Sequence, residues 1–215
     1  MMYNYSGKVT IFFNKYYEEA YMSLAVQIII GIILGLIMGF FTIISAVNKK
    51  EKELIETWNN LSKSLNTRYL KLKNVLNSLK KHMNEFQSNI EDLIKLCDKA
   101  IDEDASLESI SLRLNNENTI NYKLEEIKSC MQNYPSIQQD SKVNDAILAI
   151  IESETNVGKN IKAYNLKNIE YRVFLETFPI SIASWVLNKN PESIIPFNVT
   201  NAREFDSSYI YEDEI

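Results

Sequence analysis

The chain contains little glycine and proline. Its 215 residues include five glycines and four prolines, and neither residue occurs between positions 48 and 134. Strands joined by tight turns need such residues, because glycine and proline supply the backbone conformations that turns require. A β-sheet is therefore not expected in this stretch, and the predicted structure is helical.

Histidine, cysteine and excess basic charge are also scarce. His82 is the only histidine, and Cys97 and Cys130 are the only cysteines, which is too few for a zinc site. The sequence does not exclude a disulfide between the two cysteines, but we expect reduced thiols that pack among apolar side chains. The net charge of −5 offers no basic surface for a phosphate backbone. We predict no metal, no cofactor and no nucleic-acid partner.

Common enzyme signatures are missing as well. The sequence has no G-x-S-x-G, no glycine-rich phosphate loop, no C-x-x-C and no H-E-x-x-H. His82 lies in a stretch rich in lysine and asparagine, where a surface histidine is the expectation. We predict no catalytic residue and no enzymatic activity.

The longest apolar segment covers residues 24–47. It contains no charged residue, and its polar side chains are Gln27, Thr42 and Ser45. A helix of this length spans about 36 Å, enough to cross a hydrocarbon core about 30 Å thick. A cleaved secretory signal has a shorter apolar core and a basic start, whereas Glu18 and Glu19 precede this segment. The prediction is a retained transmembrane helix that follows a short N-terminal segment, residues 1–23.

Three glycines, Gly31, Gly35 and Gly39, recur at every fourth position of this segment. Small residues at that spacing let two membrane helices approach closely. Glycine is also common in transmembrane helices in general. Two interpretations therefore remain open. The glycines either pack this helix against a second copy or a partner in the membrane, or they have no specific role.

The lysines that flank the segment predict its orientation. Lys8 and Lys15 precede it, whereas four lysines follow it: Lys49, Lys50, Lys52 and Lys63. Basic residues are enriched on the cytoplasmic side of membrane helices. We expect a single-pass protein of the cell membrane with a cytoplasmic C-terminal domain.

Residues 48–188 are predicted to form an all-α antiparallel bundle of three long helices and a short C-terminal helix. Apolar residues step by three and four along 48–100, 105–133 and 143–178. Proline at 135 and at 179 ends the second and third helices, and the apolar residues 180–187 form a short helix that caps the bundle. Residues 189–215 are assigned to an acidic C-terminal tail, mobile from residue 198 onward.

Polar residues interrupt two of the apolar seams. Glu154 and Asn168 lie in the seam of the third helix, and Arg68 lies near that of the first. Such residues can fix helix register at some cost in stability, or they can lie at a wet edge of the seam. A charge at or near each seam leads us to predict that Arg68 and Glu154 form a buried pair.

The residues 134–179, which begin with Tyr134-Pro135 and end with Phe178-Pro179, resemble the LemA family of bacterial membrane proteins. Residues that fall at the family's spacing are Ile137, Ile150, Glu154, Val157, Tyr164, Asn165, Tyr171, Leu175, Trp58, Leu61, Leu65, Arg68, Asn74, Leu79 and Lys80. Departures are Lys73 for a proline, Glu85-Phe86 for a His-Glu pair, Arg172 for an asparagine, and Ile161 near an expected arginine. The resemblance implies one N-terminal span, long antiparallel helices and a loose link to the bacterial envelope. It implies no particular reaction.

These observations lead to the hypothesis of a non-enzymatic, membrane-anchored scaffold or interaction protein. Its partners would be the lipid bilayer, an unknown protein and, through the membrane helix, another copy of the chain. One alternative is a sensory protein that relays a movement of the span along the first helix. Another is an envelope-associated hydrolase, which would need carboxylates and His82 in one pocket. The residues predicted to specify the bundle are Trp58, Arg68, Glu154, Tyr164, Asn165, Tyr171, Phe178 and Pro179.

Overall fold

The computed structural model describes residues 5–131 and 133–199. The described residues form six α-helices and three short 3₁₀-helices, and they include no strand. The helices are α1 (Tyr5–Leu79), α2 (Gln87–Asp102), α3 (Ile110–Met131), α4 (Pro135–Gln138), α5 (Ser141–Glu176) and α6 (Ile180–Val186). The 3₁₀-helices are η1 (Asn84–Phe86), η2 (Leu107–Ser109) and η3 (Pro191–Ser193). The predicted all-α class is confirmed.

The chain divides into two compact units, residues 1–48 and 49–215. In the first unit the backbone is helical from Tyr5 onward as part of α1. Among the described residues, one helix is long and apolar enough to cross a membrane, with a mean hydropathy of 2.7 in its most apolar window. Among the described residues, a Cβ atom added at Gly31, Gly35 or Gly39 would meet no atom within 4 Å outside the backbone of its own helix.

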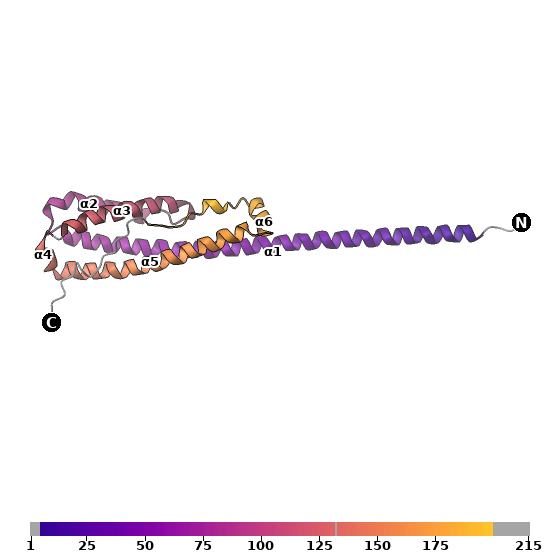
Figure 1. Cartoon of the computed structure of the whole chain (residues 1–215), viewed down its shortest axis with the longest axis horizontal. Helices are drawn as coiled ribbons and strands as arrows, with labels where there is room; N and C mark the ends of the chain where they lie inside the picture. Colours follow the sequence, from indigo (N-terminus) through magenta and orange to yellow (C-terminus); the bar gives the residue numbers. More distant parts are fainter. Residues whose placement is uncertain (1–4, 132, 200–215) are drawn as a thin grey trace. The chain divides into compact units, whose positions relative to one another are not determined.

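The second unit is a bundle in which the part of α1 from residue 49 packs with α2, α3 and α5 (Figure 1). Its core is made of aliphatic and aromatic side chains from all four helices. The fully buried members include Leu54, Trp58, Leu61, Leu65, Leu72, Leu76, Ile90, Leu93, Ile120, Ile147, Ile150 and Tyr164. The positions that step by three and four in the sequence thus face one another inside the bundle.

The first bundle helix ends earlier than the sequence predicts. We expected one helix from the membrane to about residue 100, but α1 ends at Leu79 and α2 runs back beside it. Lys80 pairs with Glu91 at 2.9 Å and Lys73 pairs with Asp98, which is an antiparallel register. Leu79, Met83 and Ile90 are all buried, so the apolar period continues through the turn without marking it. The prediction of one continuous helix was wrong for this reason.

The bundle also extends further toward the C-terminus than predicted. Residues 189–199, which we assigned to the acidic tail, pack back onto the helices. Phe197 is fully buried, and Lys189 Nζ lies 2.6 Å from Glu51 Oε1. We call residues 194–198 the C-terminal strap. The remainder of the predicted tail, residues 200–215, lies outside the described residues.

The short helix predicted after Pro179 is present as α6. Phe178, which we placed in the apolar seam of the third helix, is instead 77% exposed. α5 ends at Glu176, two residues before Phe178. The chain therefore leaves the helical path before Phe178 could continue the seam.

Candidate functional site

The centre of the bundle contains a cluster of buried charged and polar side chains. We call it the Arg68 cluster; it consists of Arg68 and Tyr69 on α1, Glu117 and Asn121 on α3, and Glu154 on α5. Each of the five is at most 6% exposed. Three helices thus contribute charged and polar side chains to a single cluster inside the bundle.

Arg68 is the hub of the cluster. Its Nη1 lies 2.5 Å from Glu117 Oε1, and its Nη2 lies 3.4 Å from Glu154 Oε1. Nη2 also donates to Asn121 Oδ1 at 2.7 Å. The predicted buried pair of Arg68 and Glu154 is confirmed, and the wet-edge alternative for Glu154 is wrong.

The protonation states follow from burial and from the neighbouring charges. Burial lowers the pKa of Arg68, but Glu117 and Glu154 outweigh it, so that the pKa is raised. Burial raises the pKa of Tyr69 well above its usual value, and the nearby Glu117 carboxylate raises it further. The Tyr69 hydroxyl donates to Glu117 Oε2 at 2.6 Å. Arg68 stays charged and Tyr69 stays neutral at physiological pH.

This arrangement suits a structural role better than chemistry on a ligand. The guanidinium is bonded to two carboxylates and an amide, and Glu117 uses both of its oxygens. In the part of the chain that the structure describes, no group of three or more His, Cys, Asp or Glu could hold a metal ion. A buried ion pair that joins several helices opposes slipped registers, because any slip leaves charges unpaired.

A second polar layer holds the C-terminal strap against α5. Tyr164 Oη donates to Ile195 O at 2.9 Å, and Asn168 Nδ2 donates to the same oxygen at 2.9 Å. Asn165 bonds the Phe197 backbone twice, accepting from its N–H at 2.8 Å and donating to its carbonyl at 3.2 Å. Asn168 is therefore buried in this layer rather than at a wet seam edge.

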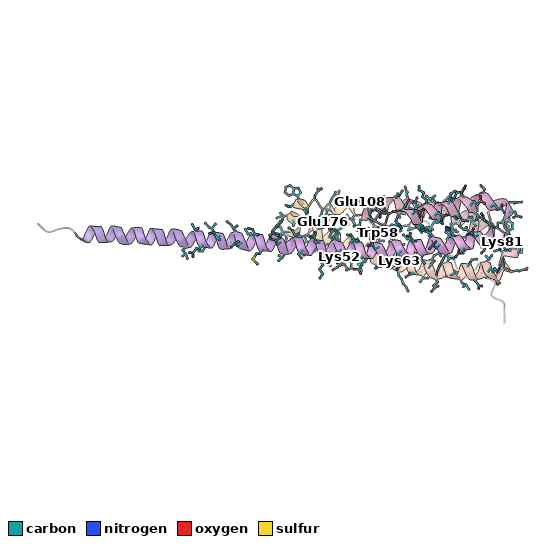
Figure 2. The ribbon with its side chains drawn as sticks, turned by 180° about the vertical axis from the view of Figure 1, so that it is seen from behind. Lys52, Trp58, Lys63, Lys81, Glu108 and Glu176 are labelled. Carbon is teal, nitrogen blue, oxygen red and sulfur yellow. The ribbon has the colours of Figure 1, made fainter. Side chains whose placement is uncertain are left out.

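Trp58 packs against the strap from the other side. Its ring centroid lies 5.8 Å from that of Phe197 and 5.4 Å from that of Tyr164. Its Nε1 donates to Ala105 O at 2.7 Å, which fixes the connection between α2 and α3. Figure 2 shows Trp58 on the bundle part of α1, along which the exposed Lys52 and Lys63 also lie.

Tyr171, another predicted site residue, borders a cleft of about 350 Å³. Residues from α1, η2, α5 and the segment after α6 line this cleft, among them Glu51, Glu108 and Lys189. The buried Tyr171 hydroxyl makes no hydrogen bond. Burial, with a smaller contribution from Glu51, raises its pKa to about 12. Among the described residues, the buried hydroxyl thus has no hydrogen bond that offsets its loss of contact with water.

His82 lies in a polar contact of its own. Its side chain is 18% exposed, and Nε2 lies 2.9 Å from Asp140 Oδ2. Its Nδ1 lies 3.3 Å from Ser136 Oγ. The hydrogen bond with His82 lowers the pKa of Asp140, as does the bond from the Lys142 backbone N–H. His82 is half-buried rather than a surface residue, and the side chains in contact with it are those of Asp140 and Ser136.

The predicted site residues separate into two groups. Six of them lie within the bundle or against the strap: Trp58, Arg68, Glu154, Tyr164, Asn165 and Tyr171. Phe178 is exposed, and Pro179 follows it through a cis peptide bond just before α6. Glu117 and Asn121 were not among the predicted residues; they lie in the asparagine-rich stretch 115–121.

The two cysteines are both free, Cys97 buried and Cys130 half-buried. Burial raises the pKa of Cys97 to about 12. A buried thiol of this kind behaves as a small apolar side chain. The expectation of reduced thiols is confirmed.

Comparison with known proteins gives one match. A family model described as LemA family matches residues 57–205, which is more than half of the chain. No curated protein and no solved structure matches the chain. The matched region includes the Arg68 cluster, α6 and the strap.

Proposed function

The chain belongs to the LemA family, and we propose that it is a membrane-anchored scaffold whose helical bundle presents a surface to another protein. Residues 24–47 hold it in the cell membrane as a single span, and the bundle lies on the cytoplasmic side. The excess of lysines after the span supports that orientation. The Arg68 cluster fixes the bundle, so that the surface keeps its shape.

An exposed apolar stripe on α5 carries this proposal. Leu166, Ile169 and Val173 are each more than half exposed. Their spacing of three and four places them on one face of the helix, opposite the seam that the core buries. Contiguous apolar residues on the surface of a folded domain are typical of protein–protein contact sites.

The stripe can be tested by photo-crosslinking in native membranes. A crosslinking residue at Ile169 should give a discrete adduct, whereas one at the exposed Asn156 on the same helix should not. Leu166→Lys combined with Val173→Lys should abolish the adduct, because lysine cannot enter an apolar contact. Equal crosslinking from both positions, or none from Ile169, would rule out the stripe as a partner surface.

Membrane anchoring and orientation need separate measurements. The full chain should stay in the pellet after alkaline carbonate extraction of membranes. In intact spheroplasts the bundle should resist external protease and become sensitive only after lysis. Digestion from outside would reverse the proposed orientation without affecting the anchoring.

A second candidate function is relay of a signal from the membrane to the bundle. Its support is that α1 is one uninterrupted helix from Tyr5 to Leu79 and carries Arg68 itself. A rotation of this helix would move the guanidinium relative to Glu117 and Glu154. Inserting a flexible Gly-Ser pair after Asn48 would abolish a relay and leave a passive scaffold functional.

We further infer that the chain has no catalytic activity. The support is that the charged groups in the bundle core are bonded to one another rather than directed into an open cleft. Incubating the purified chain with panels of ester, peptide and glycoside substrates tests this inference. Turnover that disappears in Asp140→Asn would overturn it and point to the contact of His82.

A further inference from the structure

The helix α6 is packed with its small side chains inward and its large apolar side chains outward. Ala183 and Ser184 are buried, and Ser184 Oγ donates to Leu175 O of α5 at 3.2 Å. Ile182, Trp185 and Val186 point away from the bundle and are 55%, 82% and 54% exposed. On a helix whose outer face meets water, the large apolar side chains face the core and the polar side chains face outward.

Phe178 extends this outward face. It lies before α6, with Pro179 between, and is among the most exposed apolar residues of the described chain. We call Phe178, Ile182, Trp185 and Val186 the α6 surface. Residues 177–188 contain no charged side chain; Glu176 precedes them and Lys189 follows. The α6 surface is therefore apolar, aromatic and free of charge.

Ion pairs hold this end of the bundle beside the first turns of α1 after the uncharged segment. Lys189 pairs with Glu51 at 2.6 Å, and Lys167 pairs with Glu53 at 3.7 Å. Glu51 and Glu53 follow Val47 by four and six positions in the sequence. The segment that follows α6 is thus paired with the charged residues with which the bundle part of α1 begins.

We propose that the α6 surface lies in the bilayer, at the boundary between headgroups and acyl chains. The proposal rests on the anchoring of residues 24–47 described above. Tryptophan and phenylalanine favour this zone, because the ring is apolar while the indole N–H can meet water or headgroups. Apolar helix faces that carry tryptophan or phenylalanine enter this boundary.

A bilayer fits this surface better than a protein partner does. A protein contact usually combines apolar anchors with polar groups that fix its geometry, and the α6 surface has no charged group. It also adjoins Lys189, whose partner Glu51 follows the proposed span by four positions in the sequence. The stripe on α5 lacks this tryptophan and has lysine and glutamate between its members.

The two tryptophans of the chain allow a direct test. The full chain is reconstituted into vesicles of phosphatidylcholine and phosphatidylglycerol whose acyl chains carry bromine near the headgroup. Trp185 should be quenched and the buried Trp58 should not, so that about half of the emission is lost for a helix inserted at this depth. Trp185→Phe should remove the quenchable component, and its exposed position leaves the fold intact.

Spin labels provide a second measurement with a matched control. Ile182→Cys and Leu148→Cys, each with Cys130→Ser, place labels at positions of equal exposure, 55% and 52%. Leu148 lies near Glu152, which pairs with Lys71, 24 positions after Val47 in the sequence. Oxygen should relax the label at 182 more than a water-soluble nickel complex does, and the reverse should hold at 148.

The outcomes separate this proposal from the anchoring itself. Release of the chain by carbonate would remove the anchor and with it the proposed function. A retained chain whose Trp185 is reached by acrylamide but not by brominated lipid would overturn the α6 proposal alone. Protection of Trp185 from both quenchers would show a protein, such as a second copy, on this surface and would also overturn it.

Discussion

Arg68 on α1 and Glu154 on α5 are 86 positions apart in the chain, yet 3.4 Å separates Arg68 Nη2 from Glu154 Oε1. Glu117 of α3 completes the contact from a third helix. Charges enter an apolar core only when they neutralise one another there. The cluster therefore links three helices at one level and constrains how each is rotated and shifted.

Removal of the guanidinium should destabilise the bundle strongly. Arg68→Met leaves Glu117 and Glu154 buried without a counter-charge, and breaking such a group costs about 3–5 kcal/mol. Denaturant unfolding of the full chain in detergent, followed by the helical circular dichroism signal, measures this loss. Lys71→Met, which breaks the exposed pair with Glu152, should cost less than about 1 kcal/mol.

Removal of all three charges should restore much of that stability. Combining Arg68→Met with Glu117→Gln and Glu154→Gln removes all three charges of the Arg68 cluster, and glutamine at 117 can still accept from the Tyr69 hydroxyl. The triple variant should unfold at a higher denaturant concentration than Arg68→Met alone. If the single variant is as stable as the wild type, the cluster does not hold the bundle.

Periodicity in the sequence predicted the helices but not where the first one turns back. The seam of α5 is readable because apolar residues occupy it with only two polar exceptions, Glu154 and Asn168. The turn after Leu79 is not readable, since Met83 is buried like the residues on both sides of it. An apolar pattern of period 3.6 shows which residues face the core. The two helices of a helical hairpin face the same core, so the pattern continues through the turn between them.

The polar residues of the core were only partly predictable from the sequence. Arg68 and Glu154 stood out because each lies at or near an apolar seam. Glu117 and Asn121 did not, because the stretch 115–121 reads as a weak, solvated helix. Its polar side chains face Arg68, so a weak apolar pattern here indicates a polar core and not a surface. Only the three-dimensional contacts distinguish these two cases.

Tyr171→Phe should leave the protein as stable as the wild type at neutral pH, or slightly more stable. In the part of the chain that the structure describes, the buried hydroxyl has no hydrogen-bond partner, and its removal eliminates an uncompensated polar group. At alkaline pH the wild type should lose stability, because the pKa of Tyr171 is raised to about 12 in the folded state. The unfolded chain releases this proton first, so the loss begins near pH 10 and grows as pH rises.

The comparison that checks this prediction is the slope of unfolding free energy against pH. Above pH 10 the slope should be less steep in Tyr171→Phe than in the wild type. Tyr122→Phe removes a hydroxyl from a side chain that is 63% exposed and should leave the slope unchanged. Equal slopes in all three proteins would contradict the shifted pKa of Tyr171.

The C-terminal strap should depend on Asn165. Asn165→Ala removes both hydrogen bonds to the Phe197 backbone. Each such bond contributes about 0.5–1.5 kcal/mol, so hydrogen exchange at the Phe197 amide should accelerate about tenfold or more. Asn156→Ala, at an exposed position of the same helix, should leave that exchange rate unchanged. Unaltered exchange in Asn165→Ala would show that Trp58 packing and the hydrogen bonds of Tyr164 and Asn168 hold the strap without Asn165.

Asp140 should contribute through two separate interactions. Its carboxylate accepts from the Lys142 N–H as the N-cap of α5 and contacts His82. Asparagine keeps the cap but not the charge, whereas alanine keeps neither. The melting temperature should therefore fall in the order wild type, Asp140→Asn, Asp140→Ala. The pKa of Asp140 is lowered in the folded state, so its stabilisation should be present above pH 4 and should fade as pH falls below that value. Identical melting of the wild type and Asp140→Asn would mean that the charge of Asp140 beside His82 contributes nothing.

Gly31, Gly35 and Gly39, which we call the glycine ladder, should mediate the association of two membrane helices, because no described residue outside their own helix occupies the space beside them. Added Cβ atoms at Gly31, Gly35 and Gly39 meet no neighbour, so a triple change to leucine leaves the single helix intact. It would, however, separate two helices whose backbones pack along the ladder. Crosslinking in membranes should show a dimer for the wild type and less of it for the triple leucine variant. Changing Ile30, Leu34 and Met38 to alanine, at the same spacing on a neighbouring face, is the control and should preserve the dimer. If both variants crosslink like the wild type, the glycines have no role in association, and any oligomer must form through the bundle.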